Sequence, residues 1–430
     1  MLAFAISALL TGAPRIVTLP AGTLVVDGET KVPAGFTVSG DPKGTVLRAA
    51  DTFKGRAVFV ADSNVTIRNL RIDGNRSALQ VPVRIAPDDR AFVDFYDRGN
   101  GIIARDVTGL TLQDITMREI ANFAVIVAGS DRVVMERVTV SDSGSLKRNG
   151  RNNTSGGILL EEGTRNFSVR GCSLRNIRGN GIWTHSRYRS PQNGPGVLQN
   201  NSFDTIGRDA LQIGHARETE VRDNVGRRIG WPIDVVDMEG GGTPVGLDTA
   251  GDVTLSVYTR NRFEEINGKC IDLDGASRTS VTYNTCINAK SASDYPFGHY
   301  GIVMNNTNPD MKPDEVRIRN NVIDGAKFGG IFVIGKGNVV MGNSLRRINL
   351  AHCNDTTQVN CLFDPKQPDL LRAGIYLGAG AERPAPAADT LVTDNVVEGY
   401  GMAEHCVVIG PGVSEKQRMV ESNTCRNTTP

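Results

Sequence analysis

The stretch GKCIDLDGASRTSVTYNTCINA, residues 268–289, decides the fold of this chain. Near its start, apolar Ile271 and Leu273 alternate with Asp272 and Asp274, which is the period of a β-strand that turns one face to a core. After a short polar turn, a second alternating run ends at Asn284. The pattern predicts two strands, the first with a pair of acids on its outward face.

Both halves of this stretch recur along the chain. The order small, apolar, any, apolar appears as GILL (157), GIWT (181), ALQI (210), CIDL (270), GIVM (301), GIFV (330), GIYL (374) and CVVI (406). An alternating run that ends in Asn-x-apolar appears, among other places, as VLQNNSF (197), VTYNTC (281), VRIRNNVI (316), VVMGNSL (339) and LVTDNVV (391). Because the two elements alternate with each other, the sequence is that of a repeat protein.

The period of two within each element excludes a helical solenoid. It favours an all-β solenoid, in which short parallel strands stack as coils, over residues 15–430 as a single domain. Asparagines at the bends can satisfy backbone groups and stack on the neighbouring coil. A β-propeller is the alternative, and it would need antiparallel four-stranded blades at a steadier spacing.

The opening segment RIVTLPAGTLVVDGETKVPAGFTVSG, residues 15–40, is similar to the first coils of the pectin-lyase-like superfamily. This resemblance covers residues 15–430 and implies a single-stranded right-handed parallel β-helix, in a carbohydrate-active enzyme. The superfamily contains glycosidases, lyases, epimerases and non-catalytic fibres. The segment GRDALQIGH, residues 207–215, also resembles the aspartate strand of polygalacturonase-type glycosidases and would make Asp209 the matching acid, although a tandem aspartate pair is missing.

The composition and the N-terminal residues limit the possible binding partners and the cellular location of the protein. Lysine and arginine (48) balance aspartate and glutamate (47), which argues against a nucleic-acid surface, and no stretch is as apolar as a membrane span. Residues 1–13 form an apolar run that predicts either a secretory signal or an N-terminal cap on the first coil. With a signal, the protein would be secreted or periplasmic.

Seven cysteines allow several disulfides. Cys353 and Cys361 flank a short polar loop and are the first candidates. The pairs Cys270/Cys286 and Cys406/Cys425 occupy matching places in two repeats, so each pair either bridges or consists of buried thiols. Cys172 would then be a free thiol.

The outward residues of the stacked strands form columns that collect acids on the middle coils. The first column is predicted to run Leu159, Trp183, Gln212, Asp234, Asp272, Val303, Phe332, Tyr376, and the second Glu161, His185, Gly214, Val236, Asp274, Asn305, Ile334, Gly378. One residue further on lie Glu162, His215, Asp237 and Asn306. Because neighbouring strands are about 4.8 Å apart, Asp234, Asp237, Asp272 and Asp274 would form one carboxylate cluster.

This cluster predicts chemistry on a carbohydrate. Like charges at such spacing raise at least one pKa, which keeps a protonated acid beside an ionised base. We expect Asp272, Asp274, Asp234, Asp237 and His215 as catalytic residues. The predicted substrate contacts are Glu161, Trp183, His185, Gln212, Arg217, Asn305, Phe332 and Tyr376, with the aromatic rings stacking on sugars.

Three functions fit these residues. A glycoside hydrolase needs a paired acid and base, which the aspartates supply. A polysaccharide lyase or epimerase needs a cation or a basic side chain beside its base, and calcium bound by the cluster with Arg217 or Lys269 would supply it. A non-catalytic adhesin or fibre would use the acids only as soluble surface. The hydrolase is preferred because acids dominate the face; no cofactor is required, although calcium is possible.

Overall fold

The structure is a computed structural model of the 430-residue chain. It describes residues 15–84, 86–87, 89–238, 242–307, 311–354, 361, 366–380, 383–414 and 418–428, so the signal or cap predicted for residues 1–13 lies outside the described residues. The chain forms two compact units, Met1–Leu211 with Trp231–Gly242, and Gln212–Gly230 with Thr243–Pro430. The single domain expected over residues 15–430 stays a prediction.

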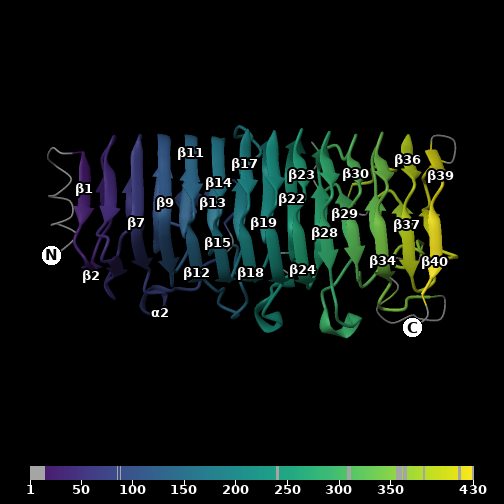
Figure 1. The fold of residues 1–430 in the computed structure, drawn as a ribbon, viewed down its shortest axis with the longest axis horizontal. Helices are drawn as coiled ribbons and strands as arrows, with labels where there is room; N and C mark the ends of the chain where they lie inside the picture. The colour runs from purple at the N-terminus through teal and green to yellow at the C-terminus, as the bar shows by residue number, and fades with distance from the viewer. Residues whose placement is uncertain are drawn as a thin grey trace. The chain divides into compact units, whose positions relative to one another are not determined.

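Each unit consists of coils whose strands pair in parallel with the equivalent strands of the next coil. One coil of the second unit contains β25 (Lys269–Asp274), β27 (Ser280–Thr282) and β28 (Thr285–Ile287). These strands pair in parallel with β29, β30 and β31 of the following coil. The predicted parallel β-helix is therefore confirmed (Figure 1).

The first unit has two sheets. One consists of β1 (Ile16–Leu19), β2 (Gly22–Val26), β4 (Thr37–Gly40), β5 (Thr45–Ala49), β7 (Val65–Asp73), β9 (Thr108–Arg118), β11 (Asp131–Glu136), β12 (Thr139–Ser143), β14 (Arg165–Arg170), β15 (Ser173–Ile177), β17 (Gly196–Gln199) and β18 (Ser202–Ile206). The other consists of β3 (Thr30–Val32), β6 (Ala57–Ala61), β8 (Asn100–Arg105), β10 (Val125–Ala128), β13 (Ile158–Glu161) and β16 (Ile182–His185). The long strands β7 and β9 each continue around a corner of the coil, so β7 pairs with both β4 and β5, and β9 pairs with both β11 and β12.

The second unit continues the same plan. One sheet consists of β20 (Thr219–Arg222), β21 (Val225–Ile229), β23 (Val257–Thr259), β24 (Arg262–Ile266), β27, β28, β30 (Arg317–Arg319), β31 (Val322–Asp324), β33 (Val339–Met341), β34 (Ser344–Ile348), β36 (Thr390–Thr393), β37 (Val396–Gly399), β39 (Arg418–Glu421) and β40 (Thr424–Asn427). The other sheet consists of β19 (Leu211–Arg217, whose first residue belongs to the first unit), β22 (Val245–Thr254), β25, β26 (Ala276–Ser277), β29 (Ile302–Asn305), β32 (Ile331–Val333), β35 (Ile375–Leu377) and β38 (Val407–Ile409).

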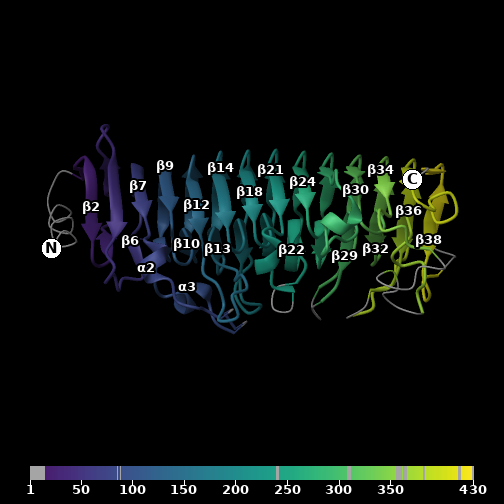
Figure 2. The same cartoon turned by 90° about the horizontal axis from the view of Figure 1, so that it is seen from below.

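Helices are short and lie outside the coils. Those that lie entirely within the described residues are α2 (Arg76–Leu79), α3 (Phe92–Phe95), η1 (Ile233–Val235) and η2 (Ala292–Asp294). α3 packs against β10 (Figure 2). Within the described residues, every helix is too short or too polar to cross a lipid bilayer.

The interior of the coils is filled by the inward positions of the repeats. Ile271 and Leu273 of β25 are fully buried, as are Ile302 and Met304 of β29 in the same register. The alternation read from the sequence therefore identifies the core face. Burial of each such side chain contributes about 1.5–3 kcal/mol relative to its exposure to water.

An asparagine ladder runs through the bends of the second unit. Six side-chain amide hydrogen bonds of 2.8–3.0 Å join, in order, Asn224, Asn261, Asn284, Asn321, Asn343, Asn395 and Asn423. In each bond the Nδ2 of one asparagine donates to the Oδ1 of the asparagine in the next coil. The predicted stacking of bend asparagines is confirmed over these coils.

The predicted disulfide Cys353–Cys361 is formed, the two pairs that the sequence left open are also disulfides, and all three lie in the second unit. Cys270–Cys286 and Cys406–Cys425 each join two strands or strand ends of one coil, and Cys353–Cys361 closes a short loop. Cys172 is a buried free thiol of the first unit. Burial raises its pKa to about 11, so at neutral pH it is an unreactive thiol.

Candidate functional site

The candidate site is a cluster of three aspartates on the outward face of β22 and β25, in the second unit. In the parallel register of these strands, Asp248 is the partner of Asp272. The next strand, β29, places Val303 beside Asp272 and Asn305 beside Asp274. Neighbouring strands are about 4.8 Å apart, so the carboxylates of Asp248 and Asp272 lie on adjacent positions of one column.

The sequence interpretation had placed Asp234 beside Asp272, and this alignment is wrong. Asp234 is exposed on η1 rather than on a strand, and the register position belongs to Asp248. Asp237 follows η1 in the first unit, where it is buried and forms an ion pair with Lys147. Neither residue therefore occupies the predicted position in the column.

Asp248 was missed because the predicted column gives its place to Asp234, which lies on η1. The tetrapeptide GLDT, residues 246–249, has Thr249 at the inward position that is apolar in most other copies, as GIWT has Thr184. Thr249 is fully buried, and its hydroxyl donates a 2.9 Å hydrogen bond to the backbone carbonyl of Asp274. Since threonine has nearly the shape of valine, it fills the inward position once this bond satisfies its hydroxyl.

Asp272 is joined to a lysine of its own strand. The Lys269 ammonium forms an ion pair and hydrogen bond with Asp272 Oδ2. Burial lowers the pKa of Lys269, but the charges of Asp272, Asp248 and Asp274 outweigh it and raise the pKa above its ordinary value, so Lys269 is a cation. Asp272 is 6% exposed, and among the described residues nothing donates a hydrogen bond to its Oδ1.

Asp274 has a different environment, two residues further along β25. Its Oδ1 accepts a 2.9 Å hydrogen bond from the backbone N–H of Thr307, and its Oδ2 accepts a 2.5 Å bond from the Thr307 hydroxyl. Burial and the charge of Asp272 raise the pKa of Asp274 to about 6, against the opposing effects of Thr307 and Lys269. The cluster thus contains a carboxyl group that still holds part of its protons near neutral pH.

The preceding strand supplies polar neighbours. Gln212 Nε2, on β19, donates a 2.9 Å hydrogen bond to Asp248 Oδ2. β19 lies next to β22, and it also carries His215, which is 8% exposed. Arg217, at the end of β19, is exposed and forms an ion pair with Glu218 rather than with the aspartates. Gln212 and His215 thus lie on the strand next to the aspartates, whereas the guanidinium of Arg217 is paired with Glu218.

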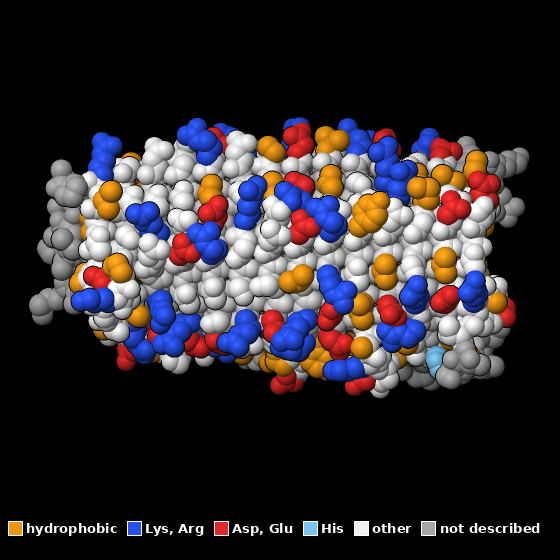
Figure 3. All heavy atoms as spheres, in the orientation of Figure 1, with side chains coloured by type: hydrophobic (Ala, Val, Ile, Leu, Met, Phe, Trp, Pro, Cys, Tyr) orange, Lys and Arg blue, Asp and Glu red, His pale blue; other side chains and the backbone are white. Residues whose placement is uncertain are grey.

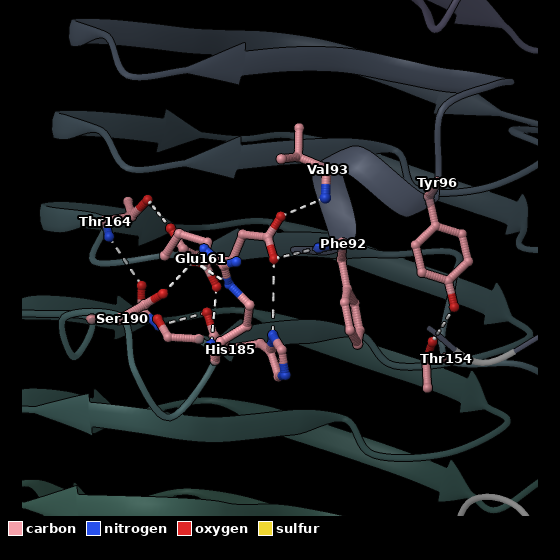
Figure 4. A network of polar contacts seen from close by, with 12 residues as sticks. Phe92, Val93, Tyr96, Thr154, Glu161, Thr164, His185 and Ser190 are labelled. Carbon is pink, nitrogen blue, oxygen red and sulfur yellow. Dashed lines mark hydrogen bonds and ion pairs between the residues drawn. The ribbon is translucent and has the colours of Figure 1, made fainter. Parts of the chain in front are cut away.

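Glu161 and His185 lie in the first unit beside α3 (Figure 4), and Trp183 packs against Phe92 of the same helix. Both oxygens of the fully buried Glu161 accept backbone hydrogen bonds, from Phe92 at 2.9 Å and Val93 at 2.6 Å. The Phe92 ring stacks on His185 at 4.3 Å and packs edge-on against Trp183 at 5.0 Å. Glu161 therefore anchors this covering segment.

The stacking role predicted for two aromatic residues is wrong. Trp183 is 6% exposed within a core cluster that includes Phe92 and Tyr96, and Tyr376 is 1% exposed within another that includes Tyr300 and Leu370. Neither ring offers a free face to a sugar. Phe332, beside Tyr376 in the register, is half-buried, and its contact with substrate stays a prediction.

Two places in the structure could be considered for a metal ion. Glu161, Glu162 and His185 have ligand atoms within 4.8 Å of one another. The two glutamates are already bound, because Glu161 holds backbone amides and Glu162 forms a salt bridge with Arg187. In the aspartate cluster, the Lys269 ammonium already supplies a cation. The donor sets therefore do not favour calcium at either place.

Comparison with known proteins places the chain by its fold. Comparison of the sequence with curated proteins gives no match. The surface adhesin PfbA of Streptococcus pneumoniae is similar with a TM-score of 0.59 and 14% identity, over 81% of this chain and 85% of that chain. The catalytic domain of a GH87 alpha-1,3-glucanase gives a TM-score of 0.57 and 11% identity, over 97% and 66%.

A third solved structure, the family 28 exopolygalacturonase of Yersinia enterocolitica, gives a TM-score of 0.54 and 12% identity, over 99% of this chain and 75% of that chain. At such identities these likenesses concern the fold alone. Residues 56–227 and 192–347 match the model of a family described as the right handed beta helix region. Because these segments together cover more than half of the sequence, the chain belongs to the right-handed β-helix family.

Proposed function

We propose that the protein is a glycoside hydrolase acting on a polysaccharide or oligosaccharide, with Asp274 as general acid and Asp272 as the base or nucleophile. The observation that carries this proposal is the unequal environment of two carboxyl groups on one strand. Asp274 has a pKa of about 6, and Asp272 is ion-paired with Lys269. Glycosidases divide their work between one protonated and one ionised carboxyl group in this manner.

Asp274 would protonate the leaving oxygen of the glycosidic bond. A carboxyl group with a pKa of about 6 is partly protonated at the pH of most enzymes and still gives up its proton readily. The two hydrogen bonds from Thr307 fix its orientation. Thr307 would therefore act as a positioning residue for the acid.

Asp272 would activate water or attack the sugar through its Oδ1. The other oxygen is held by Lys269, which fixes the carboxylate, while Oδ1 is buried and has no hydrogen-bond donor among the described residues. Asp248, held by Gln212 on the neighbouring strand, adds negative charge beside the place where an oxocarbenium ion would form. The spacing of about 6.6 Å between positions i and i+2 of a strand fits an inverting enzyme.

The fold comparisons support a carbohydrate ligand. Two of the similar structures are named as a glucanase and an exopolygalacturonase, whereas a third is named as an adhesin. The adhesin supports the alternative that this chain binds carbohydrate without cleaving it. The three disulfides support export, to the cell exterior or the periplasm.

A lyase or epimerase is a second candidate because Lys269 places a positive charge beside Asp272. Such an enzyme neutralises a uronate carboxylate while its base removes the neighbouring proton. Lys269 is already neutralised by the aspartates around it, so we rank this candidate below the hydrolase.

One experiment separates the candidates. The protein is incubated with a panel of neutral and uronate-containing polysaccharides, and both reducing ends and the ultraviolet absorbance of unsaturated products are measured. A hydrolase releases reducing ends without absorbance, and a lyase produces both. If no polysaccharide yields either signal but one of them binds, the adhesin or an epimerase replaces the hydrolase, and a change in the uronate composition of the bound polysaccharide identifies the epimerase.

A further inference from the structure

The first unit has a hollow of about 560 Å³ on its outer surface, formed only by residues of that unit. Its lining residues come from β1, β4, β5, β7 and β9 and the turns beside them. Figure 1 shows β1, β7 and β9 on the side facing the viewer, and Figure 3 draws the same side as spheres. Polar side chains dominate its lining: Thr18, Asp41, Asn69, Arg71, Asp114 and Thr116. Volumes of about 300–1,000 Å³ are usual for sites that bind small molecules.

The hollow arises from an insertion at one corner of the coils. In β7 and β9 the corner is turned by a single residue with positive φ, Asn69 (54°) and Asp114 (53°). In the coil before them, Ser39 is in register with Arg68, and Val46 with Arg71. The chain therefore takes seven residues from Ser39 to Val46, where β7 takes three from Arg68 to Arg71. The extra residues form the loop Asp41–Gly44, which makes one wall of the hollow.

Hydrogen bonds fix this loop in place. Asp41 Oδ1 accepts from the Lys43 backbone N–H at 2.8 Å, and the Gly44 N–H donates to the Asp41 carbonyl at 2.8 Å. The hydroxyl of the buried Thr45 accepts from the Asp41 N–H at 2.9 Å and donates to the Pro20 carbonyl at 2.9 Å. The wall is thus preorganised, which reduces the entropy lost when a ligand binds.

Several polar groups of the lining have no protein partner. Among the described residues, none accepts a hydrogen bond from the Arg71 guanidinium, and the side-chain amide of Asn69 and the hydroxyl of Thr116 are likewise unpaired. Asp114, in contrast, is held by Arg137 through hydrogen bonds of 2.7 and 2.9 Å. The hollow therefore offers unused donors and acceptors, with the charges of Asp41 and Arg71 balanced against each other.

We propose that this hollow is a second, non-catalytic binding site for a neutral saccharide. Sugar hydroxyls both donate and accept hydrogen bonds, which matches a lining of amide, hydroxyl, carboxylate and guanidinium groups. Because the charges of Asp41 and Arg71 offset each other, the hollow has no net charge that would attract a polyanion or a polycation. The site would hold a polysaccharide chain on the enzyme independently of the aspartate cluster.

The test is affinity electrophoresis in native gels that contain dextran or galactomannan, with polygalacturonate gels for comparison. We expect a neutral polysaccharide to retard the Asp272→Asn variant as strongly as the wild type, because the two sites are independent. Arg71→Ala should raise the apparent dissociation constant about tenfold, the equivalent of one lost hydrogen bond of the charged kind. Thr18→Trp, at an exposed position of the rim, should abolish the retardation by filling the hollow.

Arg175→Ala is the matched control, since Arg175 is an exposed arginine of β15 outside the hollow. It should be retarded as the wild type is. The proposal is overturned if neither neutral polysaccharide retards the wild type, or if Arg71→Ala and Thr18→Trp are retarded equally to it. Loss of retardation in Asp272→Asn alone would assign all binding to the aspartate cluster instead.

Discussion

Asp248 and Asp272 face each other across neighbouring parallel strands, and each is held by its own polar partner, Gln212 and Lys269. Two acids at adjacent positions of a column are unfavourable for stability, since their charges repel. The lysine offsets this cost by forming an ion pair with one of them. The arrangement is that expected of a site whose charge serves a reaction.

Replacement of Asp272 by asparagine should lower turnover about 10²–10⁴-fold while the fold is retained, because the proposed base or nucleophile is lost. The measurement is kcat on the substrate found in the panel, together with far-UV circular dichroism. Asp234→Asn is the matched control, since Asp234 is exposed on η1, and it should be fully active. Full activity of the Asp272 variant would place the chemistry elsewhere.

Activity should decline as the pH rises through about 6, because Asp274 then loses the proton that a general acid must supply. The pH profile of kcat/KM measures this for the free enzyme. Thr307→Val removes the hydroxyl bond to Asp274, which favours the ionised form, so its alkaline limb should move to higher pH. An unshifted limb in that variant would argue against Asp274 as the acid.

The same carboxyl group should make stability depend on pH. The pKa of Asp274 is about 6 in the folded protein against an ordinary value of 3.8, so the folded state binds the proton more tightly. The stabilisation of the folded state that comes from this bound proton is fully present below about pH 4, and it is lost as the pH rises through about 6. Asp274→Asn should therefore gain roughly 1–3 kcal/mol relative to wild type between these limits, measured by urea unfolding at both pH values. An equal difference in unfolding free energy between the variant and the wild type at the two pH values would contradict this prediction.

Asn321→Ala should destabilise the protein by about 2–3 kcal/mol, because it removes the hydrogen bonds that the Asn321 side chain makes with buried ladder partners on both sides. Denaturant unfolding measures the loss. Asn149→Ala, at an exposed turn position, should change stability by less than about 1 kcal/mol. Equal effects of the two substitutions would deny the ladder a role in stability.

Thiol labelling should find no reactive cysteine in the native protein. Six cysteines are in disulfides and Cys172 is buried with a pKa of about 11. Alkylation followed by mass spectrometry should modify one residue, Cys172, after unfolding without reductant, and all seven after reduction. Labelling of Cys353 or Cys361 without reductant would contradict the disulfide between them.

The sequence predicted the fold because its two elements repeat the same inward positions, as Ile271 and Leu273 show. It misplaced one strand for a physical reason: Ile233 and Val235, on either side of Asp234, imitate the alternation at η1, so η1 was assigned the place that β22 occupies. The burial of Trp183 could not be predicted, because Phe92 reaches it from a segment far away in the sequence. A period of two identifies outward positions, but it does not show which of them a loop covers.

The asparagine ladder has a consequence for how proteins of this kind change length. Its bonds join equivalent positions of successive coils, so a gain or loss of one whole coil leaves the same amide on either side of the junction. A gain or loss of part of a coil would instead bring an unmatched residue into the ladder and leave buried amides without partners. Genetic duplication and deletion in this unit are thus restricted to complete turns, while insertions in the loops between strands do not touch the ladder.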